Sequence, residues 1–258
     1  MSTEREGTLL HEWKNQTASD VKSFENYENY FDVALGTTVS KLETFPKFVR
    51  RQAISKFISR ADIFRRVLDV HGSIVDCGVN AGCSLFTFAQ LSAIFEPVNY
   101  TRKIIGFDTF EGITGVTKED LKENSSEHVR EGGFAAKGYF EDIMKGASLY
   151  DANRSLGHIP KVELVKGDIR KTLPDYVDRN PHLVVSLLHL DLDIYEPTKV
   201  AIEVLRPRMP KGAVIIFDEL NQQGYPGETT AVLEALKISS LRIQRFPYET
   251  GISFCVLE

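Results

Sequence analysis

The sequence contains little cysteine and no long apolar run. Only three of its 258 residues are Cys. Cys77, Cys83 and Cys255 are an odd number without metal-ligand spacing, so neither a disulfide framework nor a cysteine-based metal site organises the chain. No apolar stretch approaches the roughly 20 residues of a membrane-spanning helix. The charged first residues do not resemble a secretory signal. These absences predict a reduced, cytoplasmic protein with no membrane segment.

The sequence also has no excess of basic residues. Its net charge is −5, which disfavours nucleic acid and anionic membranes as partners. The hydrophobic content of 42% and the charged content of 26% are those of an ordinary globular domain. Residues 1–45 are polar with interleaved aromatics, including Trp13 and Phe24, and predict an N-terminal extension. Residues 46–258 predict the main domain, which opens with a helix from Pro46 to about Val70.

Short apolar runs alternate with helical stretches along the main domain. Continuous apolar strands alternating with helices predict a parallel sheet covered on both faces. We therefore expect an α/β fold: a doubly wound, mostly parallel, seven-stranded, Rossmann-like sheet that ends in an antiparallel hairpin. The five runs of the parallel part are 73–77, 103–108, 162–167, 183–191 and 213–218, and the hairpin runs are 241–246 and 251–257.

Residues 113–160 interrupt this alternation. They separate the second and third runs by far more than a normal connection. The segment is charged at first and more helical later, so it predicts either a substrate lid or a disordered insertion.

The segment DCGVNAGCS follows the first predicted strand. Ligands of open α/β sheets bind at the carboxyl ends of the strands. Gly78 and Gly82 would let backbone approach a ligand. Asp76 could bind an ammonium group, and Ser84 could cap the next helix or bind a carboxylate. A plain strand-to-helix turn is the alternative. The glycine spacing lacks the third glycine of a pyrophosphate loop, which disfavours an NAD-dependent enzyme.

Two further aspartates end predicted strands. Asp108, in the segment FDTFEG, is placed to accept both hydroxyls of a ribose. Asp168, after the third run, could accept a hydrogen bond from an adenine amino group. The alternatives are a helix N-cap for Asp108 and a turn residue for Asp168.

Acidic residues gather where the fourth and fifth runs end. Neighbouring strand ends would bring Asp191, Asp218 and Glu219 together, and their mutual repulsion predicts raised pKa values. A hard divalent cation such as Mg²⁺ relieves that repulsion and could activate a substrate hydroxyl. Solvated capping carboxylates are the alternative, which suits Asp193 and Glu196 but not residues that terminate apolar strands.

His189 precedes Asp191 by two residues and shares its side of the strand. It could act as a catalytic base. A hydrogen-bonded core histidine, or one that supports the acidic residues, is the favoured interpretation.

These motifs together resemble the macrocin O-methyltransferase family, metal-dependent sugar O-methyltransferases of antibiotic biosynthesis. The resemblance runs from about Thr44 to the C-terminus and rests on DCGVNAGCS with its preceding helix, FDTFEG, HLDLDIYEPT and IIFDE. The family usually has Glu at position 76 and Asp at position 219. The resemblance implies a homo-oligomer and a segment 113–160 that closes over substrate. It also implies that S-adenosylmethionine is held by Asp76, Gly78, Ser84, Asp108 and Asp168. Mg²⁺ would be held by Asp191, Asp218 and Glu219, and Asp191 would also be the general base or a metal-bound helper.

The expected function is therefore methyl transfer from S-adenosylmethionine to a hydroxyl of a deoxysugar, either nucleotide-linked or on a natural product. Two other functions fit the same residues. A catechol-type or other small-molecule O-methyltransferase would use the same acidic site. A non-catalytic protein would keep only the S-adenosylmethionine pocket.

Overall fold

The computed structural model describes residues 18–258, which divide between Lys56 and Phe57 into two compact units. Trp13 lies outside the described residues. The first unit contains α1 (Ala18–Val33) and α2 (Thr38–Glu43). Thr37 caps α2, because its side chain accepts a hydrogen bond from the backbone of Ser40.

The predicted helix from Pro46 to Val70 begins later than expected. Pro46 lies in a short 3₁₀ turn, Phe45–Lys47, and the helix α3 spans Arg51–Phe64. Phe48 stacks against Tyr30 and contacts Phe31 edge-on, with ring centroids 5.7 and 5.2 Å apart. This packing within the first unit holds the chain in the turn and overrides the helical periodicity that the sequence carries.

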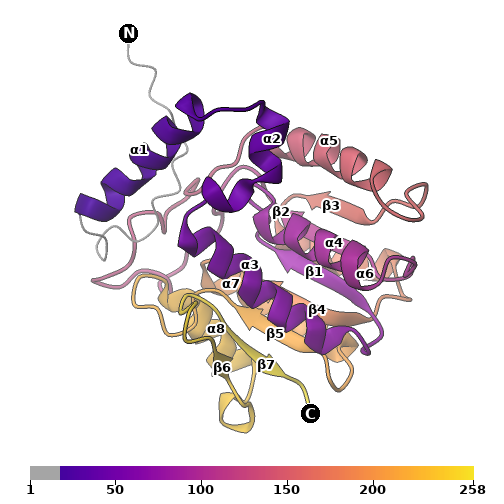
Figure 1. Ribbon diagram of the computed structural model, residues 1–258. Coiled ribbons are helices and arrows are strands. Elements are labelled where there is room, and N and C mark those ends of the chain that lie inside the picture. The colour runs from indigo at the N-terminus through magenta and orange to yellow at the C-terminus, as the bar shows by residue number, and fades with distance from the viewer. Residues whose placement is uncertain (1–17) are drawn as a thin grey trace. The chain divides into compact units, whose positions relative to one another are not determined.

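The second unit is built on a seven-stranded sheet with the order β3-β2-β1-β4-β5-β7-β6. β1 to β5 pair with one another in parallel, and β7 pairs antiparallel with both β5 and β6. The fold class predicted from the sequence is therefore confirmed, including the C-terminal hairpin (Figure 1). The strands are β1 (Ser73–Cys77), β2 (Ile104–Asp108), β3 (Val162–Lys166), β4 (Val185–Leu190), β5 (Val214–Phe217), β6 (Gln244–Arg245) and β7 (Ser253–Val256).

Two apolar clusters cover the two faces of the sheet. Adjacent residues of each strand enter opposite clusters, for example Ile74 on one face and Val75 on the other. One face packs against the end of α3, α4 (Cys83–Phe95) and α5 (Tyr139–Ala152). The other face packs against α6 (Ile169–Arg179), α7 (Tyr195–Leu205) and α8 (Pro226–Ala235). Burial on both faces explains why the strands read as continuous apolar runs.

Residues 113–160 are structured around α5 and a series of turns. The hydroxyl group of Tyr150 in α5 donates a hydrogen bond to the carbonyl of Ala89 in α4, at 2.6 Å. The turns before α5 contribute Ile113 and Val129 to a third apolar cluster, which also contains Ile194 and Tyr225. Among residues 18–258, no helix is long and apolar enough to span a bilayer.

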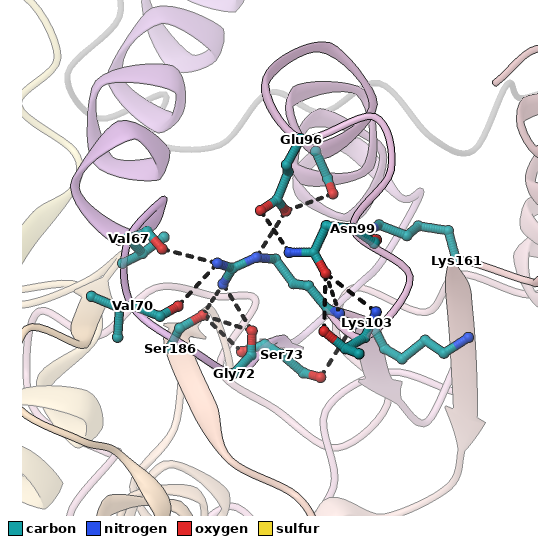
Figure 2. A network of polar contacts seen from close by, with 12 residues as sticks. Val67, Val70, Gly72, Ser73, Glu96, Asn99, Lys103, Lys161 and Ser186 are labelled. Atoms are coloured by element: carbon teal, nitrogen blue, oxygen red, sulfur yellow. Dashed lines mark hydrogen bonds and ion pairs between the residues drawn. The ribbon is translucent and has the colours of Figure 1, made fainter. Parts of the chain in front are cut away.

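A buried arginine ties the amino ends of the strands together. Arg102 is 3% exposed, and its guanidinium forms an ion pair with Glu96 at 2.8 Å. Its partners come from the chain that precedes β1 and from the start of β4, and Figure 2 shows Val67, Val70, Gly72 and Ser186 gathered there. Its remaining hydrogen bonds go to the carbonyl groups of Val67, Val70 and Gly72 and to the hydroxyl of Ser186.

We expect Arg102→Met to destabilise the protein by about 3–5 kcal/mol, because it leaves Glu96 and several carbonyl groups buried without their partner. Urea unfolding followed by circular dichroism measures the change. Arg65→Met is the control, since Arg65 pairs with Asp62 at an exposed site and should cost under about 1 kcal/mol. Equal losses for the two variants would contradict a structural role of the buried network.

Candidate functional site

Backbone hydrogen bonds fix the carboxyl ends of the central strands beside one another. The amide of Asp191 donates to the carbonyl of Cys77 at 2.9 Å, and that of Asp218 donates to Leu190 at 3.1 Å. Gly78 has a φ of +93°, and a Cβ at this position would lie 1.7 Å from the carbonyl oxygen of Asp191. The close approach of Asp191 therefore requires a glycine at this position, and a contact of Gly78 with the cofactor stays a prediction.

Gly82 begins α4 in the left-handed conformation, with φ +88°. Ser84 follows inside the helix and does not cap it, contrary to one of its predicted roles. Its hydroxyl accepts a hydrogen bond from Nε of Arg60, at 3.0 Å. Another nitrogen of Arg60 lies 3.8 Å from Oδ1 of Asp218. This buried arginine therefore links the predicted cofactor loop to the acidic strand ends, and the sequence analysis did not single it out.

Asp76 and His189 form a buried pair between β1 and β4. Both side chains are fully buried, and Nδ1 of the histidine lies 2.6 Å from Oδ1 of Asp76. Within residues 18–258, Oδ2 of Asp76 and Nε2 of His189 have no hydrogen-bond partner. The carboxylate of Asp76 contacts His189 in this structure, so its contact with a ligand's ammonium group stays a prediction. His189 is hydrogen-bonded and buried, in line with its favoured interpretation.

Asp108 holds the two loops that follow β1 and β2. Its Oδ2 accepts the amide of Asn80 at 2.8 Å, and its Oδ1 accepts that of Phe110 at 2.6 Å. Burial nevertheless raises the pKa of this carboxyl. Each oxygen retains a second acceptor position. The carboxylate can therefore still receive ribose hydroxyls while fixing the loop that would hold them.

Asp168 is the N-cap of α6. Its side chain accepts the amide of Arg170 at 3.0 Å and binds the guanidinium of the same residue at 2.7 Å. The hydrogen bonds from Arg170 lower the pKa of the Asp168 carboxyl. Asp168 thus has a local capping role, close to the turn residue that was the alternative interpretation. Its contact with adenine stays a prediction.

The acidic residues come together as two overlapping groups. Ligand atoms of Asp191, Asp193 and Glu219 all lie within 4.8 Å of one another, and so do those of His189, Asp191 and Asp218. Asp191 belongs to both groups. Asp193, which the sequence analysis treated as a solvated capping residue, instead joins the cluster because its backbone adopts a φ of +63°.

The crowding of these groups has the predicted electrostatic effect. Burial raises the pKa of Asp191, and the charges of Asp218 and Asp193 raise it further, while Arg60 opposes the shift. Burial and the charge of Asp218 also raise the pKa of Glu219. Glu228, which the sequence analysis missed, is fully buried and accepts the amide of Glu219 at 3.1 Å.

Comparison with known protein families identifies the chain. A family described as a methyltransferase domain matches residues 75–220, which is more than half of the sequence and includes both the cofactor loop and the acidic cluster. This chain belongs to that methyltransferase family.

Solved structures agree with this assignment. A structure of CalS11, described as a calicheamicin methyltransferase, is 31% identical with a TM-score of 0.90, covering 99% of each chain. An apo structure of CalS11, described as a TDP-rhamnose 3'-O-methyltransferase, is 29% identical over 93% of this chain and 95% of its own, with a TM-score of 0.81. The O-methyltransferase NovP shares the fold at 20% identity, covering 79% of this chain and 80% of its own, with a TM-score of 0.61. A comparison with curated protein sequences gives no match.

The prediction of an S-adenosylmethionine-dependent O-methyltransferase is therefore confirmed. The methyltransferase carries its acidic cluster on the loops that follow β4 and β5, beside the β1–α4 loop that the sequence analysis assigned to the cofactor. The roles of the individual residues at this site remain predictions.

The pKa of Asp193 predicts how the stability of the metal-free methyltransferase depends on pH. Burial and the charge of Asp218 raise this pKa from 3.8 to about 7. The folded protein therefore holds a proton that the unfolded chain releases between about pH 4 and pH 7, and stability falls as pH rises through this window. One such group contributes a slope of at most about 1.4 kcal/mol per pH unit.

We expect Asp193→Asn to make this decline shallower, so that in EDTA the variant gains stability over the parent between pH 5 and pH 7. Urea unfolding at several pH values measures the slope. The exposed residue Glu203 supplies the control, Glu203→Gln, which should leave the slope unchanged. A slope for Asp193→Asn equal to that of the parent would mean that Asp193 ionises normally.

Proposed function

We propose that this methyltransferase transfers the methyl group of S-adenosylmethionine to a hydroxyl of a sugar, with the help of a divalent cation. The observation that carries the proposal is the cluster of Asp191, Asp193 and Glu219 beside the predicted cofactor loop. The similarity to CalS11, described as acting on TDP-rhamnose, supports a nucleotide-linked deoxysugar as the acceptor class.

The acidic cluster fits a hard cation such as Mg²⁺. Its donors are carboxylate oxygens, which Mg²⁺ prefers. Oε2 of Glu219 is buried and has no hydrogen-bond partner within residues 18–258, which leaves a donor oxygen available. Ligands at about 2.1 Å from one ion lie at most about 4.2 Å apart, close to the 4.8 Å spread of the atoms here. We propose Asp191, Asp193 and Glu219 as ligands, with Asp218 contributing from the adjoining group.

Asp191, His189 and Asp76 would then have different roles in the reaction. A bound cation lowers the pKa of the acceptor hydroxyl. Asp191 belongs to both acidic groups and would receive the proton that the hydroxyl loses. His189 is held by Asp76 at its Nδ1, and a ring nitrogen of the histidine lies within 4.8 Å of ligand atoms of Asp191 and Asp218. We assign His189 the role of positioning and charge balance at Asp191, with Asp76 setting its orientation.

The cofactor would lie over the β1–α4 loop. Asp108 would accept the ribose hydroxyls with the acceptor positions that Asn80 and Phe110 leave open. Ser84, near Arg60, would meet the carboxylate of the methionine portion. Holding the donor and the hydroxyl in line is how such a site accelerates transfer.

Calorimetric titration of S-adenosylhomocysteine, in Mg²⁺ and then in EDTA, tests the cofactor site. We expect binding in both buffers, because none of the proposed cofactor contacts involves the cation. Absence of binding in both would contradict the assignment of the β1–α4 loop to the cofactor.

Asp191→Asn tests the acidic site. We expect it to abolish turnover and to leave the affinity for S-adenosylhomocysteine within a few fold, since the residue would contact acceptor and cation only. Methyl transfer to TDP-rhamnose, and to catechol for comparison, measures turnover. Loss of affinity for S-adenosylhomocysteine would mean that the acidic cluster contacts the cofactor, which contradicts its assignment to acceptor and cation. Transfer to catechol alone would favour the catechol-type function, and cofactor binding without transfer to any acceptor would favour a non-catalytic protein.

A further inference from the structure

Residues 113–134, the first part of the long segment between β2 and β3, contact both loops that carry the acidic cluster. We call these residues the brace. One loop is 191–194, between β4 and α7, and the other is 218–225, between β5 and α8. The brace is joined to these loops by one buried carboxylate, by hydrogen bonds and by an apolar cluster.

The buried carboxylate is Asp120, which is 0% exposed. Its Oδ1 accepts the backbone amide of Tyr195 at 2.7 Å, immediately after the loop that holds Asp191 and Asp193. Its Oδ2 accepts the amide and the hydroxyl of Thr117, at 2.7 and 2.9 Å. Asp120 therefore fixes the end of the first acidic loop to a turn of the brace.

The second acidic loop is held by different residues. The amide of Ser126 donates to the carbonyl of Gly224 at 2.9 Å, and the hydroxyl of Tyr225 donates to Oγ of Ser126 at 3.2 Å. The apolar cluster then joins all three segments. It contains Ile113 and Val129 from the brace, Ile194 from the first loop and Tyr225 from the second.

The start of α8 closes the arrangement. A Cβ on Gly227 would lie 1.9 Å from Oδ1 of Asp120 and 2.6 Å from the amide nitrogen of Tyr195. No other residue type fits beneath this hydrogen bond. The next residue, Glu228, accepts the amide of Glu219. The hydrogen bond made by Asp120 and the backbone of Glu219 are thus connected through two consecutive residues of α8.

We propose that Asp120 is a positioning residue of the acidic site: through Tyr195 it sets the spacing between Asp191 and Asp193 on one loop and Glu219 on the other. This inference rests on the proposed cation site. Because Asp120 lies outside the cluster and touches neither acceptor nor cofactor, its loss should loosen the ligands without removing any of them. Partners of this kind typically change metal affinity by about ten- to a hundredfold.

Mn²⁺ is the probe, and electron paramagnetic resonance measures the free ion in a titration of the full chain. We expect Asp120→Ala to weaken Mn²⁺ binding about ten- to a hundredfold while leaving the affinity for S-adenosylhomocysteine within a few fold. Asp120→Asn keeps an oxygen for Tyr195 but presents an amide to Thr117, so we expect a smaller loss. Ser125→Ala is the matched control. Its hydroxyl donates to the backbone carbonyl of Asp120, but it contacts neither acidic loop.

The outcomes separate this inference from the proposed function. If the unmodified protein binds no Mn²⁺, the cation site itself is wrong. If it binds Mn²⁺ and both Asp120 variants bind equally well, the positioning role is overturned. Parallel loss of Mn²⁺ and S-adenosylhomocysteine in Asp120→Asn would also overturn it, because Asp120 would then support the fold in general. A selective loss of Mn²⁺ affinity, graded from Asn to Ala, supports the inference.

Discussion

Repulsion among buried and partly buried carboxylates at the ends of β4 and β5 is the constraint on which the site of this methyltransferase depends. Asp191, Asp193, Asp218, Glu219 and Glu228 all lie in this region. Two charges 4 Å apart interact by about 4 kcal/mol at an effective dielectric constant of 20. A fold that gathers so many acids must bind protons or a cation there, and it must hold the loops against the repulsion. The raised pKa values of Asp191 and Glu219 express this requirement in the metal-free protein.

The neighbouring polar residues can be understood as responses to this constraint. Arg60 places a buried positive charge near Asp218 and opposes the upward shift in the pKa of Asp191. Nδ1 of His189 lies 2.6 Å from Oδ1 of Asp76, a contact that fixes the ring beside Asp191 and Asp218. Arg60 and His189 are thus each held in place by contacts within the protein, and neither needs a ligand for its local order.

Much of this architecture was predictable because it depends on periodicity and on strand ends. Each strand buried on two faces is a continuous apolar run, and parallel strands bring their terminal residues to one edge. Asp191 and Glu219 meet for that reason. Asp193 was misjudged because a left-handed backbone, invisible in the sequence, turns it back into the cluster. The helix start at Pro46 was misjudged because the packing of Phe48 on Tyr30 and Phe31 depends on tertiary structure.

Arg60 and Asp120 could not be predicted, since each acts over a long sequence separation. Arg60 lies in a helix whose apolar spacing explains the helix without it, and its partners Ser84 and Asp218 are distant along the chain. Asp120 lies in a charged stretch whose composition suggested either a lid or disorder. Only the fold shows that it is fully buried against Tyr195.

The brace also limits how the site can open. Loops without regular structure lose conformational entropy when they are ordered, and repelling charges add to that cost. The hydrogen bonds of Asp120 and Ser126 and the cluster around Ile194 and Tyr225 offset it. Lifting residues 113–134 would break all of these contacts and release the acidic loops at the moment when they are needed. Closure of residues 113–160 over substrate, which the family resemblance implies, stays a prediction, and a movement of residues 113–134 would have to break all of these contacts together.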